Sequence, residues 1–370
     1  MEKLTVSEGF VINLYTPTEL KAHLDEYIIG QDQAKRSLCT AIYNHYKRLI
    51  ISRSGIQNKV EKSNMLIAGP SGCGKTAMVK CIADYMGVPY YIGDATSITQ
   101  AGYVGDDVET LITGLLRACD YNIEKAQCGI VFLDEIDKLA KRGANPNISR
   151  DVVGEGVQQA LLKIVEGNIV GVPPMGGRKH PEAQLLYVDT TNILFVGSGA
   201  FSGIEPIIKE RVAPERGIGF NSAEAEEIND DDIYSYMCQE DLREFGMIPE
   251  FIGRFPKVVT ISQLKTDELV KIITEPKDSI ANQYATLLAM DDIELSIEKS
   301  AVRFIADLAI KLKTGARALR SIFEDVMNDY MFDLPGSGVT ELTITESIVR
   351  EKLSKRYAKL IGKEIEEEVA

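Results

Sequence analysis

A glycine-rich segment carries the clearest chemistry in this sequence of 370 residues. It matches the pattern G-x-x-x-x-G-K-[ST] and stands directly between an apolar run over 65–68 and an expected helix over 76–86. Glycines let backbone N–H groups approach phosphate oxygens, and the start of a helix favours negative charge. The pattern and its context therefore predict an ATP site. Its expected binding residues are Gly69, Pro70, Ser71, Gly72, Cys73, Gly74, Lys75, Thr76 and Ala77.

Two acidic residues directly after a second apolar run, 130–133, are expected to complete the ATP site. A carboxylate at the carboxyl end of a strand can hold a metal ion, and the next carboxylate can polarise an attacking water molecule. We expect Lys75 to pair with the β- and γ-phosphates and to contribute to catalysis. Thr76 and Asp134 would bind Mg²⁺, and Glu135 would act as the catalytic base. Taken alone, an Asp-Glu pair after apolar residues would equally fit a solvated strand end.

The surrounding elements indicate an α/β fold. Short apolar runs alternate with helical stretches, which is typical of a parallel sheet covered by helices. After Pro256 the pattern changes to amphipathic helices with two short strand signals. We therefore predict a P-loop large domain with a parallel sheet flanked by helices, followed by a smaller, mostly helical α+β domain. The expected ranges are 1–15 for an N-terminal extension, 16–258 for the large domain and 259–370 for the small one, with strands at 65–68, 89–92, 130–133 and 193–196.

Two helices are expected before the glycine-rich segment. A T-x-x-E capping box at Thr16 predicts the start of the first. From Asp32, apolar side chains recur at i, i+4 spacing and predict the second, with Lys35, Lys47 and Arg48 away from its apolar face.

Composition narrows the class of protein. Hydrophobic residues make up 45% and charged residues 26%, the ordinary balance of a globular protein. The sequence contains no apolar run of the roughly 20 residues that a membrane span needs and no signal or transit peptide, so we expect a cytoplasmic protein without a membrane partner. The net charge of −14 argues against a general nucleic-acid binder. Six cysteines without a C-x-x-C pair predict neither a zinc site nor a disulfide framework.

Several further segments resemble the ClpX family of AAA+ unfoldases. They are HLDEYIIGQ from His23, YNHYKR from Tyr43, GYVG from Gly102, GEGVQQALL from Gly154, GGRKH from Gly176 and PEFIGR from Pro249. The resemblance runs from about Thr16 to about Arg356. It implies a bacterial, cytoplasmic ATPase that uses ATP and Mg²⁺. Such an enzyme forms a homo-hexamer, unfolds tagged proteins and threads them through a ring pore into the ClpP peptidase.

The resemblance also implies roles in the ATP site for residues outside the glycine-rich segment. Ile28, Ile29 and Gly30 match the loop that lines the adenine pocket. Arg254 matches the arginine finger, which reaches the γ-phosphate held by the neighbouring subunit, and Arg317 matches the sensor-2 arginine of the small domain. Because an arginine finger is worth about 10³ to 10⁵ in rate in other NTPases, the isolated monomer is expected to hydrolyse ATP poorly.

Three loops are implied to contact other proteins. An aromatic and a β-branched side chain between glycines match the pore loop that grips the moving polypeptide. A basic run matches the loop at the pore entrance, where it would attract acidic or carboxylate-bearing substrates. An apolar tripeptide matches the segment that docks into ClpP, since exposed apolar pairs often mark a partner surface. In this order the residues are Gly102, Tyr103, Val104 and Gly105; Arg178, Lys179 and His180; and Ile218, Gly219 and Phe220.

One departure from the family and two alternative functions accompany this interpretation. Members of the family typically begin with a zinc-binding domain built on four cysteines, but no cysteine precedes Thr16, so no zinc is expected in this chain. The sensor-1 position falls in 196–199, where Ser198 could serve.

The first alternative is a ClpX-like remodelling chaperone that acts without a peptidase. The second is a nucleic-acid AAA+ motor, which the acidic net charge disfavours.

Overall fold

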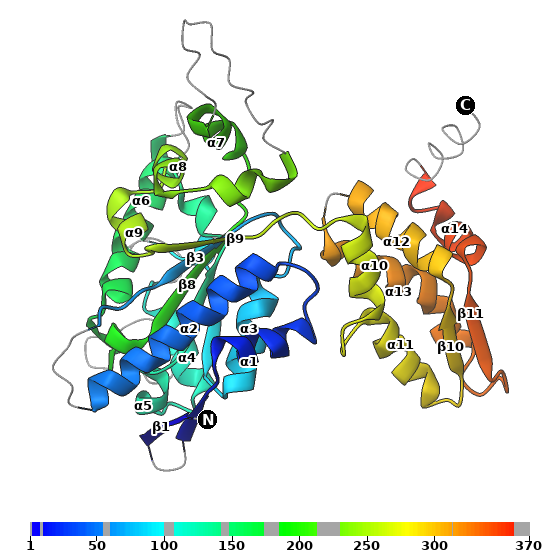
Figure 1. Ribbon diagram of the computed structural model, residues 1–370, viewed down its shortest axis with the longest axis horizontal. Coiled ribbons are helices and arrows are strands. Elements are labelled where there is room, and N and C mark those ends of the chain that lie inside the picture. The colour runs from blue at the N-terminus through cyan, green and yellow to red at the C-terminus, as the bar shows by residue number, and fades with distance from the viewer. Residues whose placement is uncertain are drawn as a thin grey trace, which may run out of the picture. The chain divides into compact units, whose positions relative to one another are not determined.

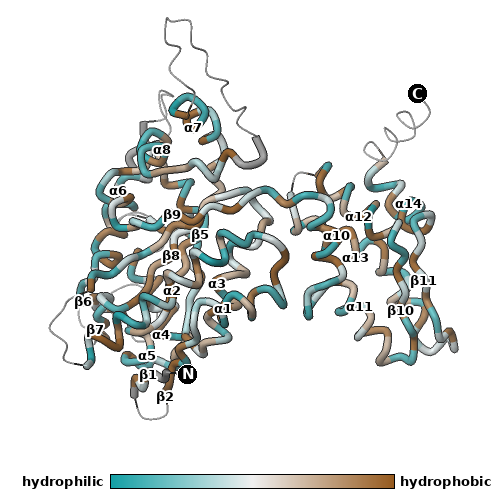
Figure 2. Tube along the Cα trace, viewed as in Figure 1, coloured by the Kyte–Doolittle hydropathy of each residue, from teal (hydrophilic) through white to brown (hydrophobic). Residues whose placement is uncertain are grey.

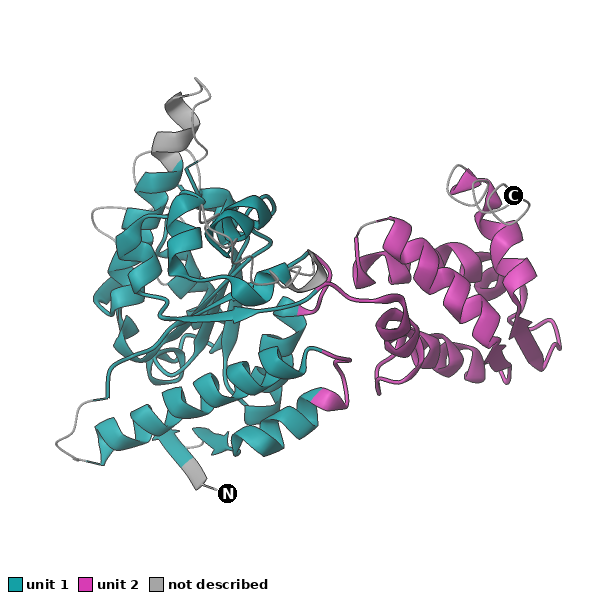
Figure 3. Cartoon of the chain, turned by 45° about the horizontal axis from the view of Figure 1, so that its top comes forward, with its two compact units in different colours: residues 1–24, 31–70, 75–262 teal, residues 25–30, 71–74, 263–370 magenta. Residues whose placement is uncertain are grey.

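The chain folds into two compact units in a computed structural model (Figure 3). The large unit contains residues 1–24, 31–70 and 75–262, and the small unit contains 25–30, 71–74 and 263–370. The structure describes residues 2–7, 10–54, 60–99, 107–141, 148–173, 185–212, 230–312 and 314–358. Within these ranges no helix combines the length and the apolar character needed to cross a bilayer.

A five-stranded parallel sheet forms the centre of the large unit, with strand order β4-β5-β8-β3-β9 (Figure 1). The strands are β3 Met65–Ala68, β4 Tyr90–Asp94, β5 Ile130–Asp134, β8 Leu194–Gly199 and β9 Lys257–Thr260. The three central strands are covered on both faces, so most of their side chains are apolar without alternation, as the hydropathy colours of Figure 2 show. The expected α/β fold with a parallel sheet is confirmed.

Helices of the large unit connect and cover these strands. They are α1 Pro17–Asp25, α2 Asp32–Arg53, α3 Lys75–Met86, α4 Thr110–Ala118, α5 Ile123–Ala126, α6 Ile148–Glu166, α7 Glu205–Val212, α8 Gln239–Glu244 and α9 Pro249–Gly253. The capping box that begins α1 is present, because Thr16 Oγ1 accepts the N–H of Glu19 at 3.3 Å and the Glu19 carboxylate accepts the N–H of Thr16 at 2.7 Å. Helix α2 crosses the sheet in Figure 1 and contacts the edge strand β9.

Two short antiparallel ribbons are present that periodicity did not predict. The first pairs β1 Glu2–Ser7 with β2 Phe10–Leu14, inside the range 1–15 expected to form an N-terminal extension. Its apolar side chains Leu4, Ile12 and Leu14 are buried. The second pairs β6 Ile169–Val172 with β7 Leu186–Asp189.

The small unit is mostly helical, as expected. Its helices are α10 Thr266–Thr274, α11 Ile280–Ala289, α12 Lys299–Lys311, α13 Ala316–Asp333 and α14 Glu346–Ser354, and β10 Glu294–Ile297 pairs in parallel with β11 Glu341–Ile344. Its core includes Ile305, Leu319 and Phe323. Because β9 belongs to the large sheet, the large unit extends to residue 262, whereas the sequence pattern placed the boundary at 258.

Candidate nucleotide site

The loop after β3 starts with a glycine that its surroundings require. Gly69 has a φ of +151°, and a Cβ atom there would lie 2.3 Å from the carbonyl oxygen of Ile261. The N–H of Gly69 also donates to the carbonyl oxygen of Gly199 at 3.2 Å. The beginning of the loop is therefore fixed against the carboxyl ends of β8 and β9.

This crowding leads to a prediction about Gly69→Ala. We expect the substitution to lower the free energy of unfolding of the large unit by about 2–4 kcal/mol, because it combines an unfavourable φ with a steric overlap against backbone. The matched control is Gly203→Ala, where φ is +94° but no atom lies within 4 Å of the added Cβ. Urea denaturation of both variants separates the two effects. Equal losses would show that φ alone matters and that the contact with Ile261 does not.

Lys75 lies at the first position of α3, and its side chain is buried. Its Nζ donates to the carbonyl oxygens of Gly69 at 2.6 Å and Pro70 at 2.8 Å. These two bonds hold the ammonium group against the start of the loop.

The end of β5 faces the start of α3. Thr76 Oγ1 donates to Asp134 Oδ2 at 3.4 Å, and the other carboxylate oxygen of Asp134 accepts the N–H of Glu135 at 2.9 Å. A hydroxyl group and a carboxylate are hard oxygen ligands of the kind that Mg²⁺ prefers. The structure thus brings together the two side chains expected to bind the metal ion, and metal binding itself stays a prediction.

Glu135 adopts an unusual backbone conformation directly after this pair. Its φ is +57°, in the left-handed region that residues other than glycine seldom occupy, and its side chain is exposed. Such strain is common at functional sites. An exposed carboxylate beside Asp134 is suited to accept a proton from a water molecule.

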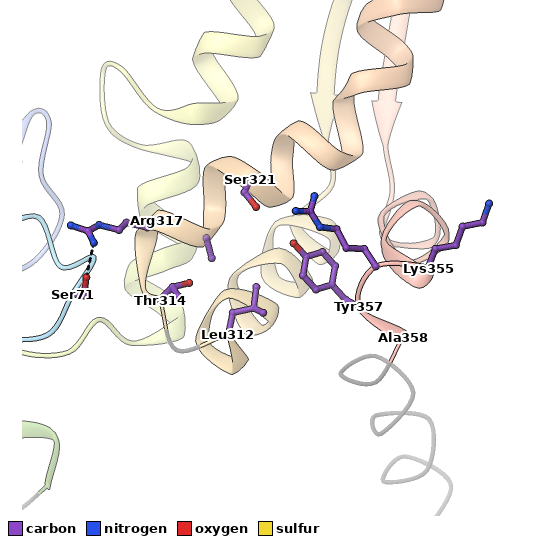
Figure 4. Close-up of a pocket in the computed structure, with 10 residues that line it drawn as sticks. Ser71, Leu312, Thr314, Arg317, Ser321, Lys355, Tyr357 and Ala358 are labelled. Atoms are coloured by element: carbon purple, nitrogen blue, oxygen red, sulfur yellow. Dashed lines mark hydrogen bonds between the residues drawn. The ribbon is translucent and has the colours of Figure 1, made fainter. Parts of the chain in front are cut away.

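The middle of the same loop, residues 71–74, belongs to the small unit, where it contacts the start of α13. Arg317 donates from a terminal guanidinium nitrogen to Ser71 Oγ at 2.9 Å, as Figure 4 shows. The N–H of Ala316 donates to the carbonyl oxygen of Gly72 at 3.2 Å. Gly72 has a φ of +78°, and a Cβ there would lie 2.3 Å from the carbonyl oxygen of Thr314. The structure therefore places Arg317 directly on the phosphate-binding loop.

The segment expected to line the adenine pocket is also in the small unit. Ile28, Ile29 and Gly30 are half-buried. A Cβ on Gly74 would lie 4.0 Å from Ile28 Cγ2, and one on Gly30 would lie 2.3 Å from a carboxylate oxygen of Glu268. These contacts bring Ile28 close to the loop, and the φ of +67° at position 30 favours glycine there.

A cavity of about 880 Å³ opens beside Arg317 in the small unit. Figure 4 shows Ser71 and Arg317 at one end and Lys355 and Tyr357 at the other. Its volume is in the range of ordinary small-molecule sites, about 300–1,000 Å³.

Arg254 belongs to the large unit. It follows α9 and is about half exposed, and its Nε donates to Glu166 Oε1 at 2.8 Å. Among the described residues it forms no hydrogen bond or ion pair with Lys75, Thr76 or Asp134. A role for Arg254 in catalysis therefore needs a contact that the described part of one chain does not contain.

Two polar residues, Asn64 and Gln31, hold backbone in this region although no sequence motif marks them. Asn64 Nδ2 donates to the carbonyl oxygen of Arg254 at 3.0 Å, and its Oδ1 accepts the N–H of Phe195. Gln31, with a φ of 59°, forms two side-chain hydrogen bonds with the backbone of Ser262. Ser198 Oγ is buried and has no hydrogen-bond partner among the described residues. Asn64 and Gln31 thus fix neighbouring backbone segments, and the sensor-1 role of Ser198 stays a prediction.

The three loops expected to contact other proteins lie outside the described residues, so their roles stay predictions. They are the pore segment 102–105, the basic segment 178–180 and the apolar tripeptide 218–220. In the described ranges no cluster of three or more His, Cys, Asp or Glu side chains could hold a metal ion.

Comparison with known proteins agrees with the geometry. Residues 60–258 match a family described as an AAA domain of the Cdc48 subfamily, and residues 264–349 match the C-terminal D2-small domain of ClpB protein. The ATP-dependent Clp protease ATP-binding subunit ClpX of Bacteroides thetaiotaomicron is 47% identical over 92% of this chain and 82% of its own length. The subunit of the same name from Porphyromonas gingivalis is 47% identical over 92% of this chain and 83% of its own. The chain therefore belongs to the ClpX family of AAA+ ATPases.

Proposed function

We propose that the chain is the ATP-driven unfolding and translocating subunit of a two-component protease. It works as a homo-hexameric ring in the bacterial cytoplasm and passes unfolded or tagged proteins to the ClpP peptidase. The observation that carries the proposal is a nucleotide loop joined to Asp134 through Thr76, in a chain 47% identical to ClpX subunits over 92% of its length. The domain limits 16–258 and 259–370 and the assigned site residues are part of the same proposal.

Each residue of the site has a task in hydrolysis. Lys75 pairs with the β- and γ-phosphates, and the loop N–H groups cradle them. Thr76 and Asp134 hold Mg²⁺, which neutralises charge on the phosphate oxygens when it is bound. Glu135 accepts the proton of the attacking water, and Arg317 senses the nucleotide from the small unit.

Energy from hydrolysis would reach the substrate through the loops that resemble those of the family. Tyr103 and Val104 would grip the polypeptide, and Arg178, Lys179 and His180 would attract it to the pore. Ile218, Gly219 and Phe220 would dock into ClpP. No zinc site and no nucleic-acid or membrane partner is part of the proposal.

Degradation of a folded, tagged reporter tests the proposal. We expect degradation to require ATP and ClpP together, and Phe220→Ala to reduce it at least about tenfold while ATP turnover persists, because the loss of one buried anchor weakens a docking contact strongly. The control is Tyr236→Ala, which also removes an exposed aromatic side chain. Tyr103→Ala should stop unfolding with or without ClpP.

Two outcomes would favour the alternatives. Reporter unfolding that ignores both ClpP and Phe220 would indicate a remodelling chaperone without a peptidase. ATPase activity that DNA stimulates, and that salt suppresses, would indicate a nucleic-acid motor.

A further inference from the structure

A second cavity lies in the large unit, between α2, the segment 60–63 and the start of β9. Its volume is about 580 Å³, and none of its lining residues belongs to the nucleotide loop or to Asp134–Glu135. The charged residues that line it are Arg36, Arg48, Glu61 and Lys257. Positive charge therefore exceeds negative charge in the lining.

Arg48 lines this cavity although only 6% of the residue is exposed. A terminal guanidinium nitrogen donates to the carbonyl oxygen of Thr191 at 3.3 Å and to Asn192 Oδ1 at 3.1 Å, and both acceptors are neutral. Its Nε is buried without a partner among the described residues. Burial lowers the pKa of the guanidinium group. A buried charge of this kind is costly until an anion pairs with it.

The neighbours of Arg48 do not supply that anion. His45 is 4% exposed, its Nε2 lies 3.2 Å from the carbonyl oxygen of Asn192, and its Nδ1 has no partner in the described part of the chain. Burial, then the charges of Arg48 and Lys62, lower the pKa of His45 to about 3. Burial and Arg48 lower the pKa of Lys62 to about 7, although Asp189 acts in the opposite direction. A neutral His45 and a basic Lys62 therefore give Arg48 no negative charge.

Two further positively charged side chains lie at the rim of the cavity. Arg36 and Lys257 are exposed, and neither forms an ion pair with any described residue. Ser37 and Ser63 also line the cavity, and their hydroxyl groups can donate hydrogen bonds. The hydroxyl of Thr40, which lines it too, already donates to the carbonyl oxygen of Arg36 at 2.8 Å.

We propose that this cavity binds a small phosphorylated molecule, with Arg48 at its base and Arg36 and Lys257 at its rim contacting the phosphate oxygens. The guanidinium fork matches two oxygens of a phosphate, and the lysine adds a point charge. The cavity is larger than a bare phosphate, and its apolar lining residues Ala41 and Val60 can contact an uncharged portion of the ligand. This site is independent of the ATPase chemistry and of the proposed partners.

Titration calorimetry with inorganic pyrophosphate tests the proposal. The experiment uses the full chain carrying Lys75→Ala, in magnesium-free buffer of constant ionic strength, so that binding at the nucleotide loop is weakened. We expect one pyrophosphate per chain, and Arg36→Gln or Lys257→Gln should each weaken binding roughly 5- to 50-fold, since each removes a charge-assisted hydrogen bond. Both side chains are exposed, so the variants should fold as the parent does.

Lys47→Gln is the matched control, because Lys47 is exposed on the same helix but does not line the cavity. Its binding should stay within about twofold of the parent, since it removes charge only at a distance. Equal weakening by Lys47→Gln and the two rim variants would overturn the proposal, as would a lack of pyrophosphate binding. Citrate that binds as tightly as pyrophosphate would overturn the assignment to a phosphorylated ligand.

Discussion

Glu135→Gln should reduce ATP turnover by about 10²- to 10⁴-fold, the usual contribution of a general base, while ATP still binds. The amide has nearly the shape of the carboxylate but cannot take a proton from water. Binding should persist because the hydrogen bonds of Lys75 to the loop do not involve the Glu135 side chain. Glu135 contacts Asp134 through its backbone N–H, which the substitution does not change. Phosphate release measures turnover, and a fluorescent ATP analogue measures affinity.

Asp94→Asn is the control for this prediction. Asp94 ends β4 directly beside Asp134 in the sheet register, so it is also a carboxylate at the carboxyl end of a strand. Its Oδ1 accepts the N–H of Thr96, and an asparagine can accept the same bond. Turnover of this variant should stay within about twofold, because the substitution keeps the cap and is outside the proposed chemistry. Turnover of Glu135→Gln close to that of the parent would mean that another group is the base.

The parts of the site that could be predicted from sequence are those set by neighbours along the chain. The glycine-rich loop and the apolar run before it are one continuous segment. Thr76 ends the glycine-rich pattern and Asp134 follows the apolar run 130–133, so both were expected to bind the same metal ion, and the structure brings them together. The capping box at Thr16 is equally local, since all of its hydrogen bonds lie within four residues.

What could not be predicted depends on contacts between distant segments. Helical periodicity placed Lys35 and Arg48 away from the apolar face of α2, yet both are buried. Arg48 is covered because the carbonyl oxygen of Thr191 and the side-chain oxygen of Asn192 accept its hydrogen bonds. The sequence of α2 contains no sign of these distant partners. Strand β9 has only four residues and is held in the sheet by its pairing with β3, so it was not among the strands expected from the sequence.

Backbone-holding side chains escaped prediction for the same reason. Asn64 precedes β3 and binds the backbone of Arg254 and Phe195, which lie far away in the sequence. An isolated asparagine before a strand is typical of many loops. Its importance follows from the packing of β8 and α9 around it, and single-sequence patterns do not contain that information.

Arg254→Gln should lower ATP turnover of the assembled protein by about 10³-fold or more, because an arginine finger stabilises charge that develops in the transition state. ATP affinity should change little. Glu166→Gln should have a small effect, since it removes a half-exposed ion pair worth about 0–1 kcal/mol and leaves the guanidinium group intact. A large loss in Glu166→Gln would show that the ion pair itself positions Arg254 for catalysis.

Mixing two inactive variants decides where Arg254 acts. Arg254→Gln chains keep Lys75, Thr76, Asp134 and Glu135, and Glu135→Gln chains keep Arg254. If Arg254 serves the site of a neighbouring copy, mixed assemblies contain intact sites at some interfaces, and turnover should rise well above that of either variant alone. If Arg254 serves its own chain, every site in the mixture lacks one essential group and no activity returns. The half-exposed position of Arg254, without a described bond to its own Lys75 or Asp134, favours the first result.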